Sequence, residues 1–100
     1  MKNTQKKNTQ RLATLSELLF LAGRKAGREH KPSGQVAYLV QEILAVCQDA
    51  QSERFYTKVA RLLPDTVVFQ FLAEIRQDPS IANKGAVFVA KVREYLERHV

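Results

Sequence analysis

Apolar residues recur at helical spacing along most of this 100-residue chain. In the first such stretch, Leu12, Leu15 and Leu19 are followed by Ala22 and Ala26, so the steps alternate between three and four residues. This spacing places all five side chains on one face of an α-helix. Four later stretches repeat the pattern, and no stretch shows the sustained alternation of a β-strand. The sequence therefore predicts an all-α fold, a single-domain bundle of about five helices.

Capping residues and prolines mark where these helices begin and end. Side chains that commonly cap helices precede four of the stretches: Thr9 (or Asn8), Ser33, Asp65 and Asn83. Pro64 ends the third helix, because the residue before a proline avoids the α-helical conformation. We expect helix starts near residues 9, 34, 53, 66 and 84.

The inward faces of these helices predict the hydrophobic core. Its expected members are Leu15, Leu19, Val40, Ile43, Leu44, Phe55, Val59, Leu62, Phe71, Leu72, Phe88, Val92 and Leu96. Residues 1–8 have no apolar side chain after Met1, so we expect a flexible basic arm there and a helical domain over 9–100.

The positive charge is concentrated at the front of the chain. Residues 1–31 hold eight Lys or Arg and two Glu, which accounts for the whole net charge of +6. The rest of the chain is neutral, with eight bases and eight acids. A basic segment on a neutral body is typical of a protein with a polyanionic partner, because Lys and Arg bound to phosphates release condensed counterions.

Little in the sequence indicates catalysis or a cofactor. His30, His99 and Cys47 lie far apart in the sequence, and no zinc, phosphate-loop, dinucleotide or nucleophile motif occurs. Cys47 falls on an apolar helix face, where a buried structural thiol is expected. We expect no catalytic residue, no metal site, no cofactor and no enzyme activity. No targeting segment or membrane span is recognisable, so we expect a cytoplasmic protein without a membrane partner.

The basic residues are the better candidates for function. They fall into three groups: Lys6, Lys7 and Arg11 in and after the arm; Arg24, Lys25 and Arg28 at the end of the first helix; and Arg54, Lys58 and Arg61 along the third. All nine can contact a phosphate backbone, DNA or RNA, without reading its sequence. The alternatives are a solubilising arm, cations that stabilise a helix C-terminus, and a solvated helix face. The Phe and Tyr residues fall mostly at core spacing, so no exposed platform for stacking bases is expected.

A protein–protein adaptor, or a homodimerising helical module with no nucleic-acid role, is the alternative function. Leu18, Phe20 and Leu21 add apolar area to the first helix beyond the stripe that packs it, and they are the candidate interface. Exposure of Phe20 and Leu21 would favour this alternative, and one contiguous basic face would favour nucleic acid.

Residues 51–96 resemble a helical element of plasmid and phage replication-associated proteins. The resemblance rests on Ser52, Phe55-Tyr56, Lys58-Val59-Ala60, the Leu63-Pro64 corner, Ile81, Asn83, Gly85-Ala86 and Phe88. It implies a DNA-processing or mobile-element context. In size, charge and helix content the chain is also similar to the small helical subunits of CRISPR effector complexes, which contact nucleic-acid backbone. Together these features predict an accessory subunit that binds nucleic acid within a larger assembly and has a protein partner or forms an oligomer.

Overall fold

The computed structural model describes residues 14–26 and 31–99. The elements in these residues are all helical, which confirms the all-α prediction. They are α2 (Leu15–Ala26), α3 (Ser33–Cys47), the short 3-10 helix η1 (Ala50–Ser52), α4 (Glu53–Leu62), α5 (Asp65–Gln77) and α6 (Lys84–His99).

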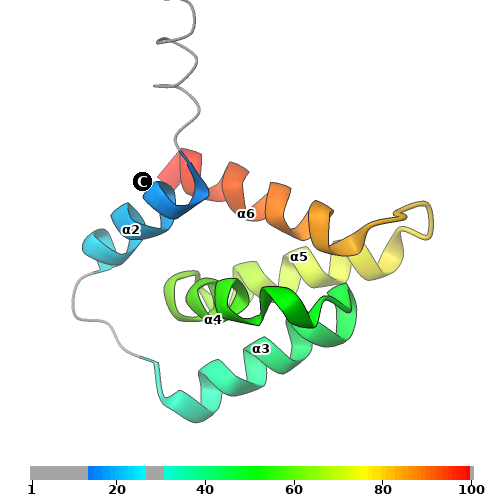
Figure 1. The fold of residues 1–100 in the computed structure, drawn as a ribbon, viewed down its shortest axis with the longest axis horizontal. Helices are drawn as coiled ribbons and strands as arrows, with labels where there is room; N and C mark the ends of the chain where they lie inside the picture. Colours follow the sequence, from blue (N-terminus) through cyan, green and yellow to red (C-terminus); the bar gives the residue numbers. More distant parts are fainter. Residues whose placement is uncertain (1–13, 27–30, 100) are drawn as a thin grey trace, which may run out of the picture.

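Figure 1 shows how the helices are arranged. Helix α6 runs along one edge of the molecule and α3 along the opposite edge, with α4 and α5 between them. Helix α2 lies beside the C-terminal half of α6 and also packs on α4. Helix α4 is therefore covered by α3 and α2 but keeps a face toward solvent.

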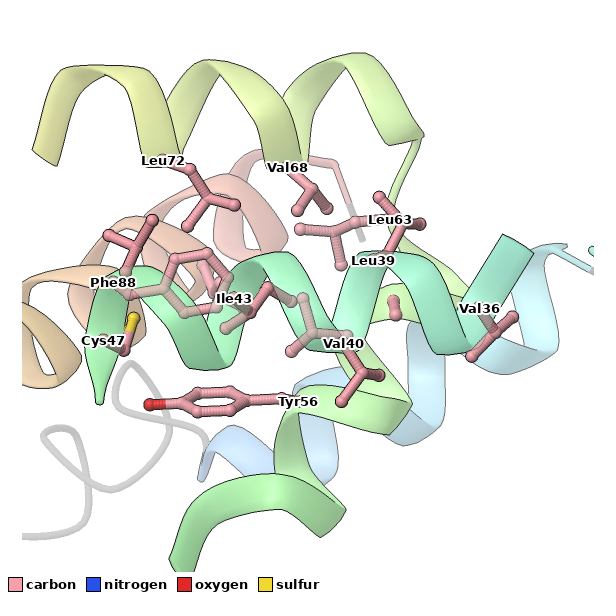
Figure 2. Packing of buried hydrophobic residues seen from close by; sticks show 14 of the residues in the cluster. Val36, Leu39, Val40, Ile43, Cys47, Tyr56, Leu63, Val68, Leu72 and Phe88 are labelled. Atoms are coloured by element: carbon pink, nitrogen blue, oxygen red, sulfur yellow. The ribbon is translucent and has the colours of Figure 1, made fainter. Parts of the chain in front are cut away.

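Helix α3 carries the most extensive buried surface. Its buried side chains are Val36, Leu39, Val40, Ile43, Val46 and Cys47. In Figure 2, Val68 and Leu72 of α5 lie on one side of α3 and Tyr56 of α4 lies on the other. Because apolar side chains line two sides of this helix, α3 holds α4 and α5 together through burial of apolar surface.

Most of the predicted core is buried. Eight expected members are enclosed: Leu19, Val40, Ile43, Val59, Leu72, Phe88, Val92 and Leu96. The other five are only partly buried and pack around the edge of this core: Leu15, Leu44, Phe55, Leu62 and Phe71. Two fully enclosed residues, Tyr56 and Ala60, were not expected on an inward face.

The predicted starts hold for α3, α4, α5 and α6, whereas the start expected near residue 9 lies outside the described residues. The first described helix, α2, begins at Leu15. Thr14 and Glu17 explain this start, because each accepts a hydrogen bond from the other's backbone N–H, at 3.1 and 2.9 Å respectively. This reciprocal arrangement is a capping box, which satisfies two otherwise unpaired donors. Thr9 and Asn8 lie outside the described residues.

Two of the predicted caps lie one position inside their helices. Ser33 and Asp65 are the first residues of α3 and α5, and Pro32 and Pro64 occupy the cap positions. Asn83 does cap α6, since its side-chain oxygen accepts a hydrogen bond from the Ala86 N–H at 3.0 Å. This bond confirms the capping interpretation of the Asn83 segment.

Candidate nucleic-acid interface

Helix α4 presents a row of bases to solvent. Arg54, Lys58 and Arg61 are spaced at i, i+4 and i+7, and all three are exposed. The opposite face of the helix carries Tyr56 and Val59, which are fully buried. Since each residue advances the helix by about 1.5 Å, the row spans roughly 10 Å. The fold thus holds three cations on one rigid face.

Acidic side chains neutralise most bases elsewhere in the described structure. Five ion pairs link a base to a carboxylate: Lys31–Asp65, Arg76–Glu42, Lys91–Glu74, Arg93–Glu97 and Arg98–Glu94. Four of these bases lie on α5 and α6. Among the described residues, Arg54, Lys58 and Arg61 form no such pair. Of the described bases without an ion pair, three lie on α4, and the others are Arg24 on α2 and Lys84 at the start of α6.

A shallow groove between α2 and α4 is lined by one base of the second group and one base of the third. Its lining includes Arg24 from α2 and Lys58 from α4, with Leu19, Gly23 and Leu62 forming an apolar floor. The helices approach closely at Gly23, where an added Cβ would make an ordinary van der Waals contact of 3.7 Å with Leu62 Cδ2. Arg24 also forms no ion pair with a carboxylate of residues 14–26 or 31–99. The α2–α4 groove thus extends the basic row of α4 onto α2.

Lys31 has a structural role at the corner between α4 and α5. Its Nζ donates hydrogen bonds to the backbone carbonyls of Ala60, at 2.7 Å, and Leu63. The same Nζ lies 2.7 Å from Asp65 Oδ1, and Gln35 donates a hydrogen bond to the other Asp65 oxygen. These bonds, chiefly the one from Lys31, lower the pKa of the Asp65 carboxyl despite partial desolvation. Lys31 thus satisfies carbonyls that the end of α4 leaves unpaired.

The structure accounts for only part of the predicted site. Lys6, Lys7, Arg11 and Arg28 lie outside the described residues, as does the side chain of Lys25. Arg24, Arg54, Lys58 and Arg61 are exposed, and the α2–α4 groove brings Arg24 together with Lys58. These four residues are the part of the predicted binding set whose arrangement is defined.

The candidate protein interface is corrected at one residue. Leu18 is a member of the core, at 6% exposure, and is therefore not available to a partner. Phe20 and Leu21 point outward and remain 65% and 44% exposed. Leu18 turns inward with Leu19 because α2 packs against both α4 and α6, which requires a wider apolar stripe than one neighbour would.

Exposed aromatic rings occur where the spacing suggested core positions. Tyr38 and Phe69 are 57% and 39% exposed, and their ring centroids lie 6.3 Å apart across α3 and α5. Phe20 is also exposed, and its ring lines the α2–α4 groove. The expectation that no aromatic platform is exposed was therefore wrong.

Cys47 lies away from these surfaces. The thiol is buried, and its Sγ is 4.0 Å from the backbone oxygen of Lys84. Burial raises the pKa of the Cys47 thiol. At neutral pH it is therefore protonated and poorly nucleophilic, as expected for a structural cysteine. Within residues 14–26 and 31–99 no three His, Cys, Asp or Glu side chains gather to hold a metal ion.

None of the described helices has both the length and the apolar composition needed to cross a membrane.

No protein-family model, curated protein or solved structure matches this chain.

Proposed function

We propose that this protein is a non-catalytic accessory subunit that binds the phosphate backbone of nucleic acid through the exposed face of α4 and the adjoining end of α2. The supporting observation is the separation of charge. Most bases on α5 and α6 are paired with carboxylates, whereas Arg24, Arg54, Lys58 and Arg61 lack such partners within the described structure. No internal ion pair has to break before these surface cations contact phosphates.

The context we propose is a replication, mobile-element or CRISPR-type nucleoprotein assembly in the cytoplasm. This part of the proposal rests on the resemblance of residues 51–96 and on the size and charge of the chain. Contacts to backbone alone position a protein but carry no sequence information. We therefore expect binding with little preference for base sequence.

The test compares two triple variants in a binding titration. The α4 variant, Arg54→Gln with Lys58→Gln and Arg61→Gln, removes three unpaired bases. The paired-base variant, Arg76→Gln with Lys91→Gln and Arg98→Gln, removes three bases that form ion pairs with Glu42, Glu74 and Glu94. Both variants lose the same charge, and Gln supports helices about as well as Arg or Lys.

Affinities are measured against single- and double-stranded DNA and RNA at two salt concentrations. We expect the α4 variant to bind at least about tenfold more weakly than wild type and the paired-base variant to bind within about threefold of it. Equal losses in the two variants would show that only net charge matters and would contradict a defined site. No binding by wild-type protein at low salt would reject the proposal.

A second candidate function is a homodimer or protein adaptor, which the exposure of Phe20 and Leu21 favours. Its test is sedimentation of the wild-type protein and of the Phe20→Ser variant without nucleic acid. A dimer that dissociates on this substitution would support the adaptor function.

A further inference from the structure

The α2–α4 groove combines cations with an exposed aromatic ring. Phe20 is 65% exposed and lies one helical turn before Arg24, so both side chains project from the same face of α2. Lys58 faces them from α4 across the groove. Among the described residues that line this groove, none is acidic. The surface therefore offers a flat apolar ring beside two positive charges.

A single nucleic-acid strand matches this arrangement better than a duplex does. Every base has a π-face that can stack on an aromatic side chain, and the phosphates on either side can reach flanking cations. In a duplex the base faces are stacked on one another, so only phosphates and groove edges are available. A duplex would use Arg24 and Lys58 but would leave Phe20 exposed.

A second copy of the chain fits the same surface less well. The exposed large apolar residues of α2 are Phe20 and Leu21, whereas a stable interface usually involves about 20 residues a side.

We infer that the α2–α4 groove binds single-stranded nucleic acid, with a base stacked on Phe20 and the adjacent phosphates at Arg24 and Lys58. This inference rests on the proposed function and narrows its ligand to strands with unpaired bases.

The chain contains no tryptophan, which permits a direct optical test. The Phe20→Trp variant carries a single indole at the stacking position. The control variant, Phe69→Trp, places the same probe at another exposed aromatic position, on α5 beside Tyr38 and outside the groove lining. Both variants are titrated with oligo(dT), oligo(rU) and a DNA duplex of equal length.

We expect both single strands to quench the indole fluorescence of Phe20→Trp and the duplex to leave it nearly unchanged. The fluorescence of Phe69→Trp should respond to none of the three ligands.

A second variant, Phe20→Leu, keeps an apolar side chain but removes the ring. We expect its affinity for oligo(dT) to fall by about 5- to 100-fold while its affinity for the duplex is unchanged.

Equal binding of single strand and duplex, unaffected by Phe20→Leu, would overturn the inference but leave the proposed function intact. Absence of binding to both ligands in wild-type protein would reject both. Indole quenching in Phe20→Trp that depends on protein concentration without nucleic acid would identify a protein interface and also overturn the inference.

Discussion

At the scale of single residues, Lys31 shows how a base can look functional in sequence and be structural in the fold. It belongs by position to the basic front of the chain, yet its Nζ binds the carbonyls of Ala60 and Leu63 and the carboxylate of Asp65. Its partners lie about 30 residues away, so no local pattern could indicate them. Sequence reasoning could find the α4–α5 corner from Pro64 but not the lysine that holds it.

The Lys31–Asp65 pair predicts a defined pH dependence of stability. The hydrogen bond from Lys31 keeps the pKa of Asp65 below its ordinary value, so the folded state binds this proton less readily than the unfolded state does. The pair therefore contributes stability above the ordinary pKa of about 4, and this contribution is lost as pH falls through the lower folded value. The Asp65→Asn variant lacks this titration.

Urea denaturation between about pH 6 and pH 3 measures this effect. We expect Asp65→Asn to be less stable than wild type at the upper end of this range, by about 1 kcal/mol, and the difference to shrink toward the lower end. A difference that stays constant over this range would show that Asp65 contributes nothing through its charge.

At the scale of elements, comparing the predicted and the observed buried face of each helix explains which core residues were predicted correctly. On α4 and the residue after it, the enclosed side chains are Tyr56, Val59, Ala60 and Leu63, whereas the expected face ran through Phe55, Val59, Leu62 and Leu63. The observed set is spaced at i, i+3, i+4 and i+7, so the pattern was present in the sequence once Tyr56 is counted as apolar. The choice between overlapping stripes depends on where α2 and α3 pack, which is a tertiary effect.

Caps and prolines made the helix positions more predictable than the faces. Helices α3 to α6 begin within one residue of the expected starts, because Pro32, Pro64 and Asn83 restrict the local backbone. Helix α2 begins after the capping box of Thr14 and Glu17, whereas the start expected near residue 9 lies outside the described residues. For the candidate nucleic-acid interface, the sequence predicted the row of bases on α4. It did not predict that Arg24 lies close to this row, because the groove forms only when α2 packs on α4.

Two adjacent residues of α3 test this account of the core. Ile43 is fully buried, whereas Leu44, predicted to be a core residue, is only partly buried. We expect Ile43→Ala to lower the free energy of unfolding by about 2–5 kcal/mol, because a cavity remains that neighbours cannot fill. Leu44→Ala should cost clearly less in the same urea titration. Equal losses would show that α3 is rotated relative to the described structure.

At the scale of the whole molecule, the central claim is that this chain separates its charges. Helices α5 and α6 carry bases that are mostly matched by acids, and α4 with the end of α2 carries bases that the described structure leaves unmatched. A protein needs no such separation to be soluble, because mixed charges suffice. Concentrated positive charge attracts polyanions and speeds their association.

The most direct test of this claim is the salt dependence of binding to oligo(dT). For wild-type protein, the α4 variant and the paired-base variant, the logarithm of the association constant is plotted against the logarithm of salt concentration. Each phosphate contact to a single strand contributes about −0.7 to the slope, so loss of three contacts should make the slope of the α4 variant shallower by about 2. The paired-base variant should keep the wild-type slope. The same change of slope in both variants, or no change in either, would contradict the account.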